Sequence, residues 1–245
     1  MKSEINFYQG KVSLNVLAKD LENAKEIFDA SDGHVLIGLL SANYDNDQEA
    51  IEDIKRYQET LNNAISIGLG AGSPEQSEMV KRISPEINPL HVNQVFTGLG
   101  STVALNTDDV LVNALVSPTS EPGYVNIATG PKSSQKEEAN IPIETAIAMI
   151  QDMGGHSLKF FPMNGLEEKE AYIKVAEACA EHNMILEPTG GIDLENFEEI
   201  IRIALDAGVK KIIPHVYSSI IDPETNETRV ADVKKLFEMI KWSVK

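Results

Sequence analysis

The sequence predicts an α/β protein folded as a (β/α)8 barrel, the TIM-barrel architecture, and three observations support this fold class. Short apolar runs rich in β-branched residues alternate with helical patterns through most of the chain, as βα units around a parallel sheet do. Eight such runs can be found. The length of 245 residues suits one barrel. A doubly wound open sheet is the alternative architecture.

The expected elements follow one another in a regular order. Leu21–Ala30 carries apolar residues at helical spacing, and residues 73–75 (SPE) and 193–195 (DLE) have the composition of helix starts. An amphipathic helix over residues 171–180 contains Cys179, for which we expect a buried packing role. The expected barrel strands are Ser13–Ala18, His34–Leu40, Ala64–Gly70, His91–Phe96, Tyr124–Ala128, Ser157–Pro162, Met184–Thr189 and Lys211–Val216.

The middle of the chain is less regular than the rest. Leu111–Ser117 (LVNALVS) reads as an extra strand, and Ser117–Gly123 (SPTSEPG) has the composition of a loop. We therefore expect an insertion within the barrel near residues 107–122. Because no low-complexity linker, visible repeat or composition shift divides the chain, residues 1–245 are predicted to form a single TIM-barrel domain.

Composition narrows the classes of function. The formal net charge of −17 argues against a nucleic-acid surface, because binding the phosphate backbone needs a positive field. One cysteine cannot form an internal disulfide, which favours a reducing compartment. No apolar stretch reaches the length of a membrane span, and the N-terminal residues lack the character of a targeting segment. We expect a cytoplasmic protein that acts on a small molecule, without a membrane or a nucleic acid.

Strand parity gives the first functional indication. Alternate side chains of a barrel strand point to the axis and to the helices. If Leu158 and Phe160 face the helices, Lys159 points inward, and Glu187 does so by the same argument. Lys159 then has two interpretations: a lysine directed at solvent, or a desolvated amine whose lowered pKa makes it a nucleophile near neutral pH. Other polar residues that can be placed inward are Asn15, Asn93 and His215.

Two loops are candidates for an anion site. Gly190 and Gly191 follow one strand directly and precede a helix, so their backbone N–H groups could approach an anion closely. Tyr217-Ser218-Ser219 follows the last expected strand. Loops after strands seven and eight commonly make the phosphate site of a barrel enzyme. A tight turn would explain either segment alone, but the two together favour a phosphate or carboxylate site.

The segments SLKFFP (Ser157–Pro162) and LEPTGGI (Leu186–Ile192) resemble the bacterial 2-keto-3-deoxy-6-phosphogluconate (KDPG) aldolases. The similarity extends to a glycine turn at residues 64–73 and to residues 124–130, and it is closest to the divergent KDGP aldolase branch. In that family the lysine of the K-F-F-P strand forms a Schiff base, and the P-T-G-G turn binds ligand. The resemblance implies a TIM-barrel class I aldolase that needs no cofactor and no metal, and that assembles into a homo-oligomer, commonly a trimer.

Carried onto this chain, the resemblance makes Lys159 the nucleophile that attacks the C2 ketone of a keto-acid sugar phosphate. The products would be pyruvate and glyceraldehyde 3-phosphate. The residues expected to bind substrate are Pro188, Thr189, Gly190, Gly191, Ser218, Ser219 and His215.

One departure from the family pattern concerns the general base. The second-strand glutamate of KDPG aldolases is missing, since the corresponding residues read HVLIGLLSANYDND. We expect Glu187 to replace it as a catalytic residue, with a water or His215 as a relay, because burial can tune a carboxyl toward the pKa that proton transfer needs. The alternative is that Glu187 only pairs with Lys159 or another inward donor.

Other functions remain open. Cleavage of 4-hydroxy-2-oxoglutarate to pyruvate and glyoxylate would use the same chemistry with a distal carboxylate. A phosphosugar isomerase or epimerase would use Glu187 as a base and form no covalent adduct, and a sugar-phosphate binder would not turn its ligand over. The histidines show no metal-site spacing, so a zinc-dependent aldolase is not expected.

Overall fold

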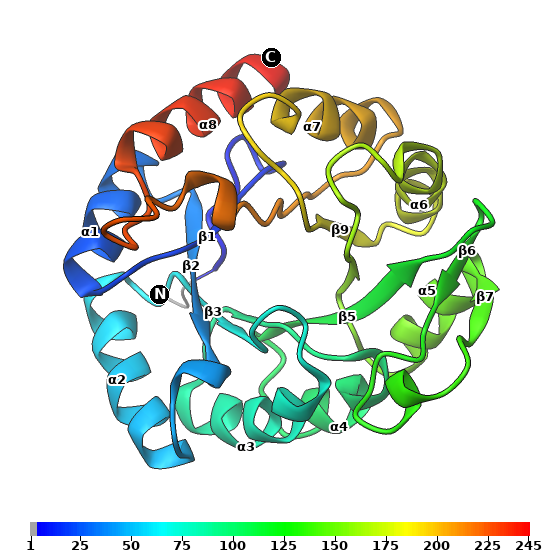
Figure 1. Ribbon diagram of the computed structural model, residues 1–245, viewed down its shortest axis with the longest axis horizontal. Helices are drawn as coiled ribbons and strands as arrows, with labels where there is room; N and C mark the ends of the chain where they lie inside the picture. The colour runs from blue at the N-terminus through cyan, green and yellow to red at the C-terminus, as the bar shows by residue number, and fades with distance from the viewer. Residues whose placement is uncertain (1–3) are drawn as a thin grey trace.

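A computed structural model of the chain describes residues 4–245. A curled sheet forms the centre, and a ring of helices surrounds it (Figure 1). The strands are β1 (Leu14–Leu17), β2 (Val35–Leu40), β3 (Ile65–Gly68), β4 (His91–Val92), β5 (Leu111–Pro118), β6 (Tyr124–Asn126), β7 (Asn140–Pro142), β8 (Ser157–Phe160) and β9 (Ile185–Pro188). The helices are α1 (Leu21–Ala30), α2 (Asp47–Thr60), α3 (Ser77–Ile87), α4 (Leu99–Val103), α5 (Ile143–Asp152), α6 (Lys169–Glu181), α7 (Phe197–Asp206) and α8 (Val230–Ser243).

The parallel strands run in the order β1-β2-β3-β4-β5-β8-β9 around the sheet. The segment 212–215 closes the circle, because Ile212 and His215 form bridges both to the β9 side and to the β1 side. Pro214 lies between these bridges and has no N–H to donate, which explains why the eighth strand is reduced to isolated bridges. This is the predicted (β/α)8 barrel.

The predicted insertion near residues 107–122 is wrong. Leu111–Pro118 is β5, which pairs in parallel with β4 and with β8 and is therefore the fifth barrel strand. The segment expected in that place begins with β6, which leaves the barrel and pairs antiparallel with the end of β5 and with β7. The physical difference is burial: most of β5 is buried, as a parallel strand covered on both faces must be, whereas β6 buries only Val125.

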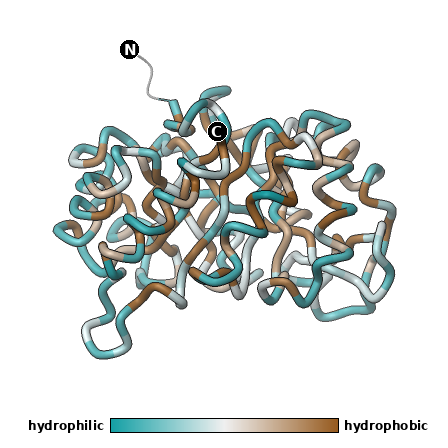
Figure 2. The backbone as a smooth tube through the Cα atoms, turned by 90° about the horizontal axis from the view of Figure 1, so that it is seen from above, coloured by the Kyte–Doolittle hydropathy of each residue, from teal (hydrophilic) through white to brown (hydrophobic). Residues whose placement is uncertain are grey.

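The helices cover the barrel with their apolar faces. In α7 the buried residues Phe197, Ile200, Ile201 and Ala204 recur at the spacing of one helix face. Asp20 caps α1 by accepting the N–H of Asn23. The helix start predicted at 73–75 is confirmed as the beginning of a 3-10 helix, Pro74–Gln76, that leads directly into α3, whereas residues 193–195 lie in a turn just before α7. Figure 2 shows hydrophobic stretches along the inner segments and mostly hydrophilic loops at the edges.

At the amino-terminal ends of the strands, the interior of the barrel is filled by apolar side chains. Leu36, Leu90 and Ile213 are buried there, and the N-terminal segment adds Ile5 and Phe7 below them. These residues form the floor of the barrel. No helix among residues 4–245 combines the length and the hydrophobicity that a membrane span requires.

Candidate active site

A cavity opens at the carboxyl ends of the barrel strands, where barrel enzymes hold their active sites. Its volume of about 440 Å³, open solvent included, falls within the usual range for small-molecule sites. The lining residues are Leu40, Gly68, Leu69, Gly70, Ala71, Gly72, Asn93, Gln94, Leu115, Lys159, Phe161, Thr189 and Tyr217.

Lys159 lies inside the barrel, as strand parity predicts. Its β8 neighbour Phe160 points outward and stacks on Tyr172 of α6. The lysine is only 8% exposed, and its Nζ donates to Asn93 Oδ1 at 2.9 Å and lies 3.4 Å from His215 Nδ1. Burial lowers the pKa of Lys159 to about 8, against a smaller opposing effect of the Glu187 charge. An amine with this pKa is partly neutral near physiological pH and can act as a nucleophile.

Glu187 lies deeper, in a fully buried polar layer between the floor and the cavity. Its Oε2 accepts from His215 Nε2 at 2.8 Å and from Asn113 Nδ2 at 2.7 Å. Its Oε1 accepts from His91 Nε2 at 2.9 Å and from the Ser157 hydroxyl.

These contacts decide the protonation of Glu187. Burial would raise its pKa, but the histidines and their hydrogen bonds outweigh this and hold the pKa of the Glu187 carboxyl well below its ordinary value. The group is therefore a carboxylate near neutral pH. The sequence left open whether Glu187 pairs with other inward side chains, and the structure shows that it does. Its partners are His91, His215, Asn113 and Ser157. Among the described residues, it makes no hydrogen bond to Lys159.

His215 joins this carboxylate to the cavity. Its Nε2 is held by Glu187, so its Nδ1 points toward Lys159 and toward the Tyr217 hydroxyl at 3.0 Å. Burial first, and then the Lys159 charge, lower the pKa of His215 to about 3, so the imidazole is neutral. The Tyr217 hydroxyl also donates to Asn15 Oδ1 at 3.0 Å. Asn15 and His215 thus lie inside the barrel, as expected.

The glycine turn after β9 packs against the loop that follows β8. Gly190 and Gly191 both have positive φ, and a Cβ on Gly191 would lie 2.4 Å from the backbone N of Gly165. The turn therefore needs glycine for backbone reasons alone. Its N–H groups are nevertheless available, because no acceptor within residues 4–245 takes the N–H of Gly190, Gly191 or Ile192.

The remaining predicted binding residues divide between the cavity and its surroundings. Thr189 lines the cavity. Ser218 and Ser219 lie in the loop after the eighth strand, and Ser219 Oγ donates to Ile192 O at 2.7 Å, which joins this loop to the glycine turn. Pro188 is buried on the outward face of β9 and is not among the cavity residues, so parity assigns its ring to packing.

Sequence reasoning missed several residues of the site. Tyr217 was noted only as part of a donor loop, yet its side chain forms a cavity wall. His91, Asn113 and Ser157, which hold Glu187, come from three different strands. Inward parity could have found Ser157, because it lies two residues before Lys159, whereas Asn113 was hidden by the wrong assignment of β5.

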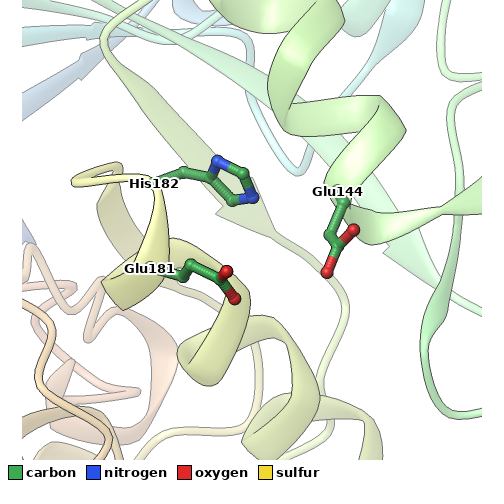
Figure 3. A group of neighbouring side chains, drawn as sticks. All are labelled: Glu144, Glu181 and His182. Atoms are coloured by element: carbon green, nitrogen blue, oxygen red, sulfur yellow. The ribbon is translucent and has the colours of Figure 1, made fainter.

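A group of potential metal ligands lies away from the cavity. Glu144 of α5, Glu181 of α6 and His182 direct their side chains toward one another on the outer helices (Figure 3). Both carboxylates are exposed, and such groups are common without an ion. We assign no metal to it.

Comparison with known proteins identifies the family of the chain. The family model described as KDGP aldolase matches residues 8–224. A 2-dehydro-3-deoxy-phosphogluconate aldolase of Salmonella typhimurium (strain 14028s / SGSC 2262) is 46% identical over 243 residues, which cover 97% of this chain and 98% of that protein.

Solved structures show the same fold at low identity. A structure described as native KDPGal has a TM-score of 0.57 at 12% identity and covers 98% of this chain and 99% of that one. A mutant tryptophan synthase α-subunit from Pyrococcus furiosus has a TM-score of 0.61 at 13% identity, covering 96% and 100%. Phosphoribosyl anthranilate isomerase from Thermotoga maritima has a TM-score of 0.59 at 13% identity, covering 94% and 99%. With the family match and the 46% identical relative, these findings make the chain an aldolase, a carbon–carbon lyase that belongs to the KDGP aldolase family.

Proposed function

We propose that the protein is a class I aldolase that cleaves 2-keto-3-deoxy-6-phosphogluconate to pyruvate and glyceraldehyde 3-phosphate through a Schiff base on Lys159. The observation that carries the proposal is the position of Lys159: a buried amine in the cavity wall, with its pKa lowered to about 8. The name of the Salmonella relative supports this substrate.

The chemistry begins with neutral Lys159. Its Nζ attacks the C2 ketone to give a carbinolamine, which takes up a proton and loses water to form an iminium that draws electrons from the C3–C4 bond. The C4 hydroxyl then loses its proton, the bond breaks, and the aldehyde leaves an enamine behind. Protonation of the enamine at C3 and hydrolysis of the imine release pyruvate. Asn93 Oδ1, 2.9 Å from Nζ, would keep the nitrogen oriented through these steps.

The distal phosphate would lie at the two loops beyond β9 and the eighth strand. The free N–H groups of Gly190, Gly191 and Ile192 are donors of the kind that bind phosphate. Ser218 would add its hydroxyl, while the Ser219 hydroxyl already bonds Ile192 O and would hold the two loops together.

Glu187 would act in the reaction without touching substrate. It is fully buried and each of its oxygens already accepts two hydrogen bonds. We therefore assign it a positioning role: it orients His215, fixes the tautomer with Nδ1 free, and stabilises positive charge on the imidazole. Assembly into a homo-oligomer, commonly a trimer in the family, stays a prediction.

Pyruvate trapping tests the proposal. The protein is incubated with pyruvate and sodium borohydride, and intact and peptide masses are measured. A reduced pyruvyl adduct on the peptide that contains Lys159 is expected, and Lys159→Met should abolish it. The exposed Lys136→Met variant, as a control, should keep it. No adduct on folded wild-type protein, beside a working aldolase, would overturn the Schiff-base mechanism.

A further inference from the structure

The Tyr217 hydroxyl connects the cavity with the buried Glu187–His215 pair. It lies 3.0 Å from His215 Nδ1 and 3.0 Å from Asn15 Oδ1, and the side chain forms part of the cavity wall. Of the cavity-lining residues, Lys159 and Tyr217 are the ones whose side chains titrate. His215 itself is only 2% exposed. Tyr217 and Lys159 are therefore the titratable groups that connect the cavity with His215, at 3.0 Å and 3.4 Å from its Nδ1.

The hydrogen bonds around Tyr217 leave a place for one further proton. Because the Glu187 carboxylate only accepts, His215 donates from Nε2, and neutral His215 presents a bare Nδ1. Asn15 Nδ2 donates to Ser66 Oγ, so Asn15 presents its oxygen. The single Tyr217 proton thus faces two acceptors. If Nδ1 gained a proton, His215 would donate to the Tyr217 oxygen while Tyr217 donates to Asn15, and every group would be satisfied.

Schiff-base formation changes the lysine side of this arrangement. Lys159 Nζ lies near both Asn93 Oδ1 at 2.9 Å and His215 Nδ1 at 3.4 Å. An iminium nitrogen keeps a single N–H, and the shorter contact directs it to Asn93. Nδ1 of His215 then loses the lysine as a donor and is free to accept from Tyr217.

We propose that Tyr217 is a catalytic residue that carries a proton between the substrate and His215 in the aldol cleavage. The proposal rests on the Schiff-base function given above. The C4 hydroxyl gives its proton to the Tyr217 oxygen while Tyr217 passes its own proton to His215 Nδ1. The C3–C4 electron pair moves into the iminium, which gives the neutral enamine and the aldehyde. In the following step, His215 returns the proton through Tyr217 to C3 of the enamine, which gives the iminium of pyruvate.

The charge balance of the site favours this route. In the resting protein, burial and the positive charge of Lys159 lower the pKa of His215 to about 3. When the iminium becomes a neutral enamine, the positive charge next to His215 disappears as the imidazole gains its own. The Glu187 carboxylate, 2.8 Å from Nε2, stabilises the imidazolium that results. The total charge of the buried group stays constant through the step.

Tyr217→Phe tests the relay in the full-length protein. Borohydride trapping of pyruvate on Lys159 should stay within about three-fold of wild type, because the relay acts after the adduct forms. Cleavage of KDPG and exchange of the pyruvate methyl protons in D2O, followed by NMR, should both fall by about 100-fold or more, as general acid–base groups contribute. Tyr172→Phe is a matched control: it removes a buried hydroxyl that donates to Ile200 O on the outer side of the barrel, and both rates should be retained.

The outcomes separate the relay from the proposed function. Failure of wild-type protein to form the adduct would overturn the Schiff base. An adduct on Tyr217→Phe with cleavage and exchange within a few-fold of wild type would overturn the relay alone, as would loss of the adduct from a folded variant. If the variant does not fold, fluorinated tyrosines at position 217 keep the side chain in place. Exchange rates that change systematically with the acidity of the phenol would support proton transfer through Tyr217. Rates that do not depend on the acidity would refute it.

Discussion

Removal of the proposed nucleophile should make the protein more stable. Burial lowers the pKa of Lys159 from 10.5 to about 8. The ammonium form therefore costs the folded state about 3 kcal/mol at pH 7, at roughly 1.4 kcal/mol for each pH unit between the two values. Methionine fills a similar volume without a charge. We expect Lys159→Met to raise the free energy of unfolding at pH 7 by up to about 3 kcal/mol, while it abolishes activity.

The pH dependence of the stability difference between wild type and Lys159→Met provides a second test of this prediction. Between about pH 8 and 10.5 the unfolded chain holds a proton on Lys159 that the folded protein has lost, so wild-type stability rises with pH through this window. The advantage of Lys159→Met should be largest below pH 8 and shrink as the pH approaches 10. Urea unfolding of wild type, Lys159→Met and the exposed control Lys136→Met at pH 7 and pH 10 measures it. A variant no more stable than wild type at pH 7, or a difference independent of pH, would refute the reasoning.

Three further outcomes follow from the same contacts. Glu187→Gln should destabilise the protein by about 3–5 kcal/mol in urea unfolding, because its amide nitrogen must face groups that donate to the carboxylate. A loss below 1 kcal/mol would contradict the buried carboxylate. Gly191→Ala should lower the melting temperature, since its φ of +68° and its 2.4 Å approach to Gly165 both oppose a Cβ; an unchanged melting temperature would show that the turn can shift. Burial raises the pKa of the Cys179 thiol, so Ellman's reagent should label it only as fast as the protein unfolds, and complete labelling of native protein within seconds would disprove this.

The barrel could be predicted from the sequence because its strands are short apolar runs between amphipathic helices. The fifth strand was the exception, since both Leu111–Pro118 and Tyr124–Asn126 fit the strand pattern. Pairing decides between them, and pairing depends on which neighbours a strand meets in space. The nearly continuous burial of β5 is the property that a parallel barrel strand requires.

The site was predicted in part. Parity placed Lys159 and Glu187 inside the barrel, because that argument needs only the strand that carries the residue. It could not show that Glu187 accepts from His91 and Asn113, which lie on other strands, or that no room is left for substrate at its oxygens. The position of Tyr217 was harder still to predict from strand parity, because Pro214 interrupts the strand that precedes it.

The apolar floor of the barrel closes the cavity at its inner end, so the cavity opens at the carboxyl ends of the strands. Leu36, Leu90 and Ile213 are buried at the amino-terminal end of the barrel and do not line the cavity, so we expect substrate to enter and both products to leave at the carboxyl ends of the strands. Under the proposed Schiff-base mechanism, the fragment bound to Lys159 would be the inner one, and the aldehyde would lie between it and the solvent. Release would then be ordered, with the aldehyde first and pyruvate last. Pyruvate should compete with substrate for the free enzyme in steady-state kinetics, and the aldehyde should not.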